Sequence, residues 1–249
     1  MPTPFYHLSL AEELLAHPQL PAAAGATLHA GRPAFLLGNT APDVQVMSGQ
    51  KRVLTHFFQV PPADDTHPVE RMLATYPDLR SAAALPADQG AFMAGYLCHL
   101  IADFEWIRSL FLPIFGVEAG WETFPHRLYI HNIVRTWLDE QVLAGLPPDE
   151  RECLAAAVPN KWLPFVEDHF LRQWRDYIEE QLQPGAAIRT VEVFASRQGL
   201  SPEVFFALLR SEERMTSEVF SHVSQQQLVE YRQRTVTASL AVLARAFDA

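Results

Sequence analysis

The chain has 249 residues, of which 49% are hydrophobic and 19% charged, and this length suffices for one large core or two modest ones without disulfides. Its formal net charge of −10 disfavours a nucleic-acid scaffold, because an acidic surface repels the phosphate backbone. The two cysteines, Cys98 and Cys153, are too few for a zinc ribbon or a disulfide framework.

The beginning of the sequence predicts one helix followed by less regular backbone. Residues 7–16 place leucine and alanine side chains on one face of a helix. The small residues of 22–33 predict a connection, and 38–43 predict a turn because Gly, Asn, Pro and Asp favour irregular backbone. A loop at 60–67 and a short helix at 69–76 are expected next.

The most regular pattern lies between residues 86 and 115, where apolar residues recur at every third or fourth position of a predicted helix. The charged residues Asp103, Glu105 and Arg108 within this stretch favour a helix in a soluble core over a membrane span. The first residues, MPTPFYHLSLAEELL, lack the basic region and long apolar run of a signal peptide, so we expect a cytoplasmic protein.

The rest of the sequence is also predicted to be helical, beginning with a helix over 123–144 that Gly145 ends. No segment shows the alternation typical of a strand. The sequence therefore predicts a single all-α, multi-helix globular domain over residues 1–249, with the candidate site in about 1–145 and a helical C-terminal subdomain in about 149–249. Further helices are predicted at roughly 149–157, 161–183, 189–198, 202–213 and 215–246.

His99 and Asp103 are the first candidates for metal ligands. They stand four residues apart in the sequence HLIAD, so a helix places the imidazole and the carboxylate one turn apart on the same side. A carboxylate in an otherwise apolar stripe is costly to bury unless it is paired or metal-bound. The pair alone is better explained by a hydrogen bond between the two side chains, so a metal site requires further ligands.

Three more polar residues stand in surroundings that suit a ligand. His56 interrupts an apolar, aromatic run (THFF), Asp43 lies where a fixed backbone can aim its carboxylate inward, and His7 lies on the apolar side of the first helix. Each alone is more often a cap, a turn residue or a buried core histidine. Together with His99 and Asp103 they match the nitrogen and oxygen ligands of Zn²⁺ and similar metals.

The order and spacing of these motifs resemble the zinc-dependent phospholipase C family, with the S1/P1-type nucleases as more distant relatives. The resemblance covers about the first 140 residues and includes HLSLAEELL from His7, the Asp43 loop, THFF at 55–58 and GYLCHLIAD at 95–103. It implies an all-helical bundle of the phospholipase C/P1 nuclease type and hydrolysis of a phosphodiester.

The resemblance also implies roles for the candidate residues. Asp43, His56, His99 and Asp103 would hold one metal, and Asp103 would bridge to a second that also binds His7. A water between the ions would attack phosphorus. Asp43 is also the catalytic candidate that orients or deprotonates this water.

The sequence departs from the family pattern at three points. Secreted members use a processed N-terminal Trp as a ligand, whereas this chain begins with Met1. The family's histidine shortly after the HxxxD pair is missing from 104–110, and its later HxxxE pair is absent because Arg135 stands four residues after His131. We therefore expect one or two ions of zinc, or of manganese or iron, rather than three.

His131 and Arg135 are candidates for substrate binding. Arg135 suits a phosphate clamp because its guanidinium is planar, and an exposed Arg135 paired with Asp139 is an equally supported interpretation. We expect a metal-dependent hydrolase that acts on a small phosphoester or phospholipid-like substrate. A non-catalytic helical binding protein with a structural metal, an S1/P1-type nuclease disfavoured by the acidic charge, and a metal-free helical protein remain alternatives.

Overall fold

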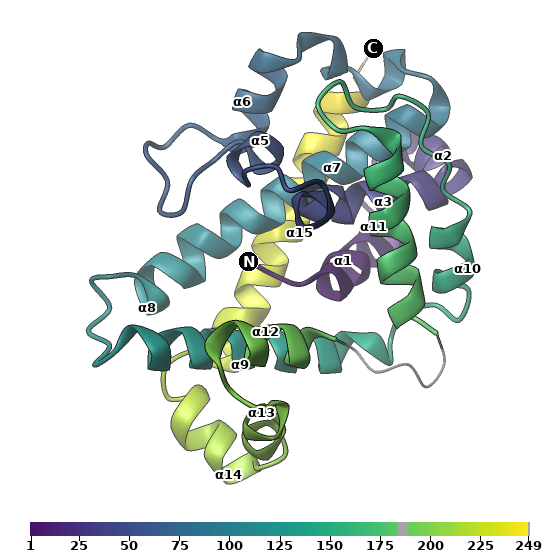
Figure 1. The fold of residues 1–249 in the computed structure, drawn as a ribbon. Coiled ribbons are helices and arrows are strands. Elements are labelled where there is room, and N and C mark those ends of the chain that lie inside the picture. Colours follow the sequence, from purple (N-terminus) through teal and green to yellow (C-terminus); the bar gives the residue numbers. More distant parts are fainter. Residues whose placement is uncertain (184–188, 249) are drawn as a thin grey trace.

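The computed structural model describes residues 1–183 and 189–248, and this part of the chain is all-α, without any strand (Figure 1). Short 3-10 helices η1 (Ala41–Val44), η2 (Pro77–Leu79) and η3 (Ala82–Ala84) and the π-helical turns η4 (Ile107–Phe111) and η5 (Met215–Val219) join the α-helices. The α-helices are α1 (Pro4–Ala16), α2 (Ala22–Ala30), α3 (Arg32–Thr40), α4 (Gln45–Ser48), α5 (Val53–His56), α6 (Pro68–Thr75), α7 (Ala87–Trp106), α8 (Leu112–Phe115), α9 (Phe124–Leu143), α10 (Glu150–Ala155), α11 (Asp168–Gln181), α12 (Thr190–Gln198), α13 (Pro202–Leu209), α14 (Glu212–Arg214) and α15 (Gln225–Phe247).

Helix α7 lies at the centre of the fold. Every residue from Gly90 to Phe104 is buried, as expected for a helix that is largely apolar around its whole circumference. The C-terminal helix α15 packs against it, and the Tyr231 hydroxyl donates a hydrogen bond to the Ala102 carbonyl at 3.1 Å (Figure 1). The last helix of the chain thus helps to enclose the helix that carries His99 and Asp103.

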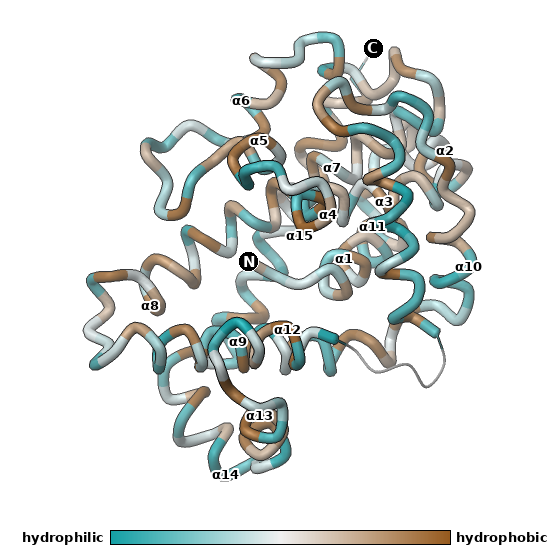
Figure 2. The backbone as a smooth tube through the Cα atoms, in the orientation of Figure 1, coloured by the Kyte–Doolittle hydropathy of each residue, from teal (hydrophilic) through white to brown (hydrophobic). Residues whose placement is uncertain are grey.

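Most long helices agree with the periodic pattern of the sequence. The predicted helix over 86–115 is present as α7, η4 and α8, with a π-helical turn that the pattern did not indicate. Helix α11 is drawn largely in hydrophilic colours in Figure 2, yet it buries Leu171, Trp174 and Ile178 at three- and four-residue spacing. None of the helices in the described part of the chain is both long and apolar enough to span a bilayer.

Two predictions for the N-terminal part are wrong. The supposed connection 22–33 contains α2, and the supposed turn 38–43 consists of the end of α3 followed by η1. Turn-forming residues are helical here because α3, which is buried from Ala34 to Thr40, packs against α7, and tertiary packing overrides local propensity.

Two C-terminal helices are shorter than predicted. The segment 161–167 is irregular, and α11 begins only at Asp168, because Lys161 has a left-handed φ of 54° and Pro164 cannot donate a helical hydrogen bond. Trp162 in this segment packs on Phe92 with ring centroids 4.9 Å apart. The predicted helix over 215–246 is interrupted after η5, and α15 starts at a capping box in which Ser224 and Gln227 each bond the other's backbone. The predicted 202–213 helix is divided into α13 and α14.

Two glycines let α3 and α7 cross with their backbones in contact. A Cβ on Gly95 would lie 2.3 Å from the Phe35 carbonyl oxygen, and one on Gly38 would lie 2.1 Å from the Phe92 carbonyl oxygen. Both distances are far inside van der Waals contact, so only glycine fits. The close crossing brings the Asn39 carbonyl of α3 within 2.8 Å of His99 Nδ1 on α7.

Gly95→Ala is therefore expected to destabilise the protein by about 1–3 kcal/mol or more, because an added methyl group must push two buried helices apart. For a chain of this size the melting temperature falls by about 2–4 °C per kcal/mol. Gly145→Ala is the matched control, since its Cβ would meet its nearest neighbour at 3.5 Å. Equal melting temperatures of the two variants in thermal unfolding would contradict the expectation.

Candidate metal centre

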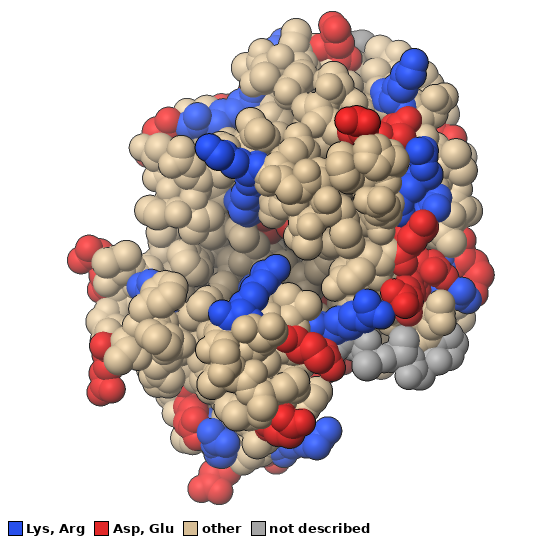
Figure 3. Space-filling model, in the orientation of Figure 1, with Lys and Arg blue, Asp and Glu red and all other residues tan. Residues whose placement is uncertain are grey.

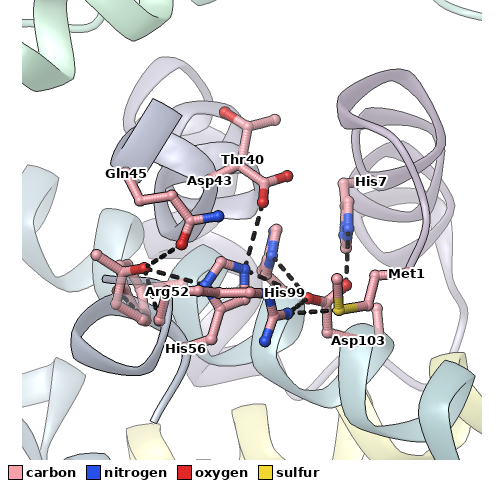
Figure 4. Close-up of polar contacts among 12 residues, drawn as sticks. Met1, His7, Thr40, Asp43, Gln45, Arg52, His56, His99 and Asp103 are labelled. Atoms are coloured by element: carbon pink, nitrogen blue, oxygen red, sulfur yellow. Dashed lines mark hydrogen bonds and ion pairs between the residues drawn. The ribbon is translucent and has the colours of Figure 1, made fainter. Parts of the chain in front are cut away.

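Five side chains from four elements converge beside α7 (Figure 4). His7 comes from α1, Asp43 from η1, His56 from the end of α5, and His99 and Asp103 from α7. We refer to these five residues, which are candidate metal ligands, as the metal centre. The four outside η1 are buried, with at most 1% of the residue exposed, whereas the Asp43 side chain is 22% exposed.

Asp103 lies in the middle of the metal centre. Its Oδ1 is 3.5 Å from His7 Nε2, and its Oδ2 is 3.3 Å from His56 Nε2 and 3.6 Å from His99 Nε2. Asp43 Oδ1 is 3.3 Å from His56 Nε2. These separations are long for hydrogen bonds but equal the spacing of about 3.4 Å between ligands at the corners of a tetrahedral zinc site.

Several ligand atoms in the metal centre lack partners among the described residues. Both ring nitrogens of His7, the Nε2 atoms of His56 and His99, and Asp103 Oδ1 are buried without a hydrogen bond. Unsatisfied polar atoms are costly to bury, so this concentration calls for a ligand that satisfies them together. Two sets of three residues, His7 with His99 and Asp103, and Asp43 with His56 and His99, have ligand atoms within 4.8 Å of one another. The side chains therefore fit a zinc ion.

Outer hydrogen bonds orient two of the histidines. His99 Nδ1 donates to the Asn39 carbonyl at 2.8 Å, and His56 Nδ1 lies 3.0 Å from the Thr55 hydroxyl, which contacts Gln45 Oε1 at 3.1 Å. Because each Nδ1 is engaged, each Nε2 is free to face Asp103. This arrangement of a ligand histidine and a backbone or hydroxyl partner is typical of metal sites.

The protonation states also suit a cation. Burial lowers the pKa of His7 and of His56 to about 4, so both rings are neutral at pH 7. Burial alone would raise the pKa of Asp43, but the adjacent His56 and His99 hold it at about 2. The pKa of Asp103 lies well below its usual value because His99, His7 and Arg52 outweigh its burial. Neutral imidazoles and ionised carboxylates are the forms that bind metals.

His99 differs from the other two histidines. Burial lowers its pKa, but the charge of Asp103 and a hydrogen bond to it outweigh burial, and the pKa of His99 is raised. One imidazole of the centre thus holds a proton more firmly than an isolated histidine, and that proton must leave Nε2 when a cation binds there.

Arg52 is a member of this neighbourhood that the sequence did not indicate. Its Nη2 donates to Asp103 Oδ2 at 2.6 Å and contacts Met1 Sδ at 2.6 Å, and its guanidinium lies 4.6 Å from the centre of the Phe58 ring. The only signal in the sequence was a basic residue four positions before His56 in a short helix. Its partner Asp103 is 51 residues away, so local pattern could not identify the contact.

A cavity of about 360 Å³ opens beside the metal centre, and Figure 3 shows a hollow near the middle of this face with Lys or Arg side chains at its rim. We call it the arginine cavity, after the four arginines in its wall. It is lined by Met1, Thr3, Pro4, Phe5, Asp43, Gln45, Val46, Arg52, Arg135, Trp174, Tyr177, Gln181, Arg189, Thr190, Val193, Phe194 and Arg197.

Arg135 faces this cavity and has no ion pair among the described residues. Its Nη1 donates to Asn132 Oδ1 at 3.1 Å, its guanidinium lies 4.3 Å from the centre of the Phe194 ring, and its Nε has no partner. Burial lowers its pKa to about 10, so it remains charged at neutral pH. Among the described residues Arg135 and Asp139 form no ion pair, so the interpretation of an exposed Arg135 paired with Asp139 is wrong.

Asp139 instead joins two other segments. Its Oδ1 accepts a hydrogen bond from Thr3, which precedes α1, and its Oδ2 accepts one from Thr190 at the start of α12 at 3.0 Å. Burial raises the pKa of Asp139 to about 7, although both hydroxyls oppose the shift.

His131 is separated from the arginine cavity, although it shares α9 with Arg135. Its Nε2 accepts a hydrogen bond from Trp106 Nε1 at 3.1 Å, and its ring packs against Phe111 and Phe115. Only 5% of the residue is exposed, and it does not line the cavity. The structure therefore places Arg135, and not His131, in the wall of the arginine cavity.

Comparison with known proteins agrees with this geometry. Residues 6–181 match the model of a family described as zinc dependent phospholipase C, and this range includes all five residues of the metal centre. Neither the curated proteins nor the solved structures gave a significant match. Because the matched range is more than half of the chain, the chain belongs to the zinc-dependent phospholipase C family.

Proposed function

We propose that this chain is a metal-dependent phosphodiesterase that holds zinc at the metal centre and cleaves a small phosphodiester or a phospholipid-like substrate. One observation carries the proposal: the buried ligand atoms without partners belong to a cluster whose member Asp43 lines an open cavity. The wall of that cavity also contains Arg135, which forms no ion pair among the described residues. Ligand atoms and a phosphate-binding cation on one cavity are what metal-assisted phosphoester hydrolysis requires.

We expect the metal centre to hold one ion. Both three-residue sets contain His99, whose Nδ1 is engaged with the Asn39 carbonyl, so it has one nitrogen to offer. Arg52 also places a positive charge beside Asp103 Oδ2, and this charge repels a second cation at the same carboxylate. Zinc is the expected metal, and manganese and iron are the alternatives that these nitrogen and oxygen ligands also accept.

Zinc, when bound, supplies a Lewis acid that lowers the pKa of a water molecule and polarises a phosphoryl oxygen. Asp43 is assigned to accept a hydrogen bond from the attacking water, because its carboxylate is ionised and is the one in the metal centre that lines the cavity. Arg135 is assigned to bind the phosphoryl oxygens, since a sheltered guanidinium without a carboxylate favours an oxyanion. Arg52 holds the orientation of Asp103.

The proposal is tested by metal analysis of protein purified without chelator and by hydrolysis of bis(p-nitrophenyl) phosphate. We expect zinc near one ion per chain and activity that a chelator removes and added zinc restores. Single-stranded DNA is the counter-substrate, and its digestion in place of the small diester would favour the nuclease alternative. No bound metal and no activity with zinc, manganese or iron would refute the proposal.

Asp43→Asn separates a catalytic role from a purely ligating one. The amide keeps an oxygen for the metal but accepts a proton poorly, so we expect kcat to fall by about 10²- to 10⁴-fold while zinc remains bound. Asp65→Asn, at an exposed aspartate in a loop, is the control and should leave kcat unchanged. Loss of zinc in parallel with activity would assign Asp43 to metal binding alone.

A further inference from the structure

The arginine cavity extends beyond the metal centre and is strongly basic. Within the described part of the chain its wall contains Arg52, Arg135, Arg189 and Arg197, while Asp43 is its only carboxylate. The whole chain has 29 acidic and 19 basic residues, so this wall is opposite in sign to the rest of the protein. A concave surface with one sign of charge concentrates ligands of the other sign.

The four arginines fall into two groups. Arg52 and Arg135 lie beside the metal centre, whereas Arg189 and Arg197 lie at the two ends of α12, the helix that crosses in front of α9 (Figure 1). Burial and the charge of Arg197 lower the pKa of Arg135, although three nearby aspartates oppose the shift. Both groups line the same cavity of about 360 Å³, so one ligand in it can meet both.

Arg197 is free to bind a ligand. It is exposed, and it forms no ion pair with any residue in 1–183 or 189–248. Arg189 has only a surface ion pair with Glu180 at 3.1 Å, in which both side chains are about half exposed. Such a pair contributes little to stability and yields readily to another anion.

Two aromatic rings of the cavity already have an arginine side chain of the protein over their faces. The guanidinium of Arg135 lies 4.3 Å from the centre of Phe194, and that of Arg189 lies 5.9 Å from the centre of Tyr177. Trp174 is stacked on Tyr177 with centroids 5.7 Å apart, and its Nε1 donates to the Thr40 carbonyl. A quaternary ammonium group binds on free aromatic faces, and here it would meet arginine instead.

We propose that the natural substrate carries a second acidic group, a phosphate or a carboxylate, next to the phosphodiester that is cleaved, and that Arg197 and Arg189 bind this group. The inference rests on the proposed function, because it places the cleaved phosphodiester at the metal centre and Arg135. It specifies the substrate class as acidic diesters and excludes diesters with a cationic head such as choline.

Three diesters with the same p-nitrophenol leaving group test the proposal, with 2-carboxyethyl, 2-phosphoethyl or choline as the second alcohol. We expect kcat/KM for an acidic diester to exceed that for the choline diester by at least about tenfold, which corresponds to one favourable charge contact. The carboxyethyl and phosphoethyl substrates distinguish the two acidic groups. A choline diester that is cleaved as well as both acidic diesters would overturn the inference while leaving the proposed function intact.

Arg197→Gln should reduce the preference for acidic over choline diester by at least about fivefold, and Arg197→Lys should retain part of it. Arg80→Gln, at an exposed arginine outside the cavity, should leave the preference unchanged. An unchanged preference in Arg197→Gln would contradict the assignment. Since Arg197 is exposed, the variant is expected to melt at the wild-type temperature.

Binding of the monoester products provides a readout without turnover. By isothermal titration, 2-carboxyethyl phosphate or ethane-1,2-diol bisphosphate should bind at least about tenfold more tightly than phosphocholine, and Arg197→Gln should remove the difference. Selective binding without hydrolysis of any diester would refute the proposed function but support the basic subsite. Equal binding of acidic and choline products would refute the subsite.

Discussion

Asp103→Asn is expected to lower zinc affinity by more than about 100-fold, because even the loss of an outer hydrogen-bond partner costs 10- to 100-fold at metal sites. Asp103 has its two oxygens directed to three histidines, so the substitution replaces the central anion of the metal centre. The substitution also removes the carboxylate that pairs with the partly buried Arg52, and this loss should destabilise the folded protein further. Phosphodiester hydrolysis should fall at least as far at limiting zinc.

Zinc content after dialysis and kcat/KM with bis(p-nitrophenyl) phosphate measure this result. Asp88→Asn is the matched control, because Asp88 lies exposed in the first turn of the same helix, α7. It should keep its zinc and its activity. An Asp103→Asn protein with full zinc occupancy would mean that the centre is not built around this carboxylate.

Removal of zinc should produce the second large effect, a fall of about 8–16 °C in melting temperature. Zinc at 1,000 times its dissociation constant stabilises the folded chain by about 4 kcal/mol, and each kcal/mol corresponds to about 2–4 °C for a protein of this size. Without a bound ion, ligand atoms of four buried residues have no hydrogen-bond partner, namely those of His7, His56, His99 and Asp103. The folded protein without zinc should therefore be less stable than the protein with zinc.

Thermal unfolding with a chelator, and again after zinc is restored, measures this effect. Asp103→Asn provides the control, because a chain with much weaker zinc binding should lose most of the difference in melting temperature between samples with and without chelator. A wild-type melting temperature that responds to neither treatment would contradict a structural contribution of the metal.

The regular helices were predictable because burial of one face imposes a period that the sequence shows directly. Helix α3 was not, since Gly38 and Asn39 are turn formers in isolation. The backbone of Gly38 touches the Phe92 carbonyl, and Phe92 lies 54 positions further along the chain. Glycine is required at position 38 because of a contact with a residue far away in the sequence. A local sequence pattern cannot distinguish a glycine needed for close packing from a glycine that forms a turn.

The candidate metal ligands were identifiable from residue type, spacing and resemblance to a family. The residues around them were not. Arg52 reaches Asp103 through a contact between distant segments, and Arg197 lies in a C-terminal segment that the sequence predicted only to be helical. Their sites depend on how α5 and α12 are placed against α7 and α9, which side-chain periodicity does not encode.

The carboxyl group of Asp139 has a further consequence for selectivity. One of its oxygens accepts a hydrogen bond from Thr3, which leads into α1, and the other accepts one from Thr190 at the start of α12. Both threonines line the arginine cavity, so Asp139 fixes the separation between two of its walls. The width of the cavity is thereby set by a residue that does not itself line it. Replacing Asp139 with a shorter or a longer side chain would change which molecules fit the cavity, although the candidate metal ligands and the four arginines would be unchanged.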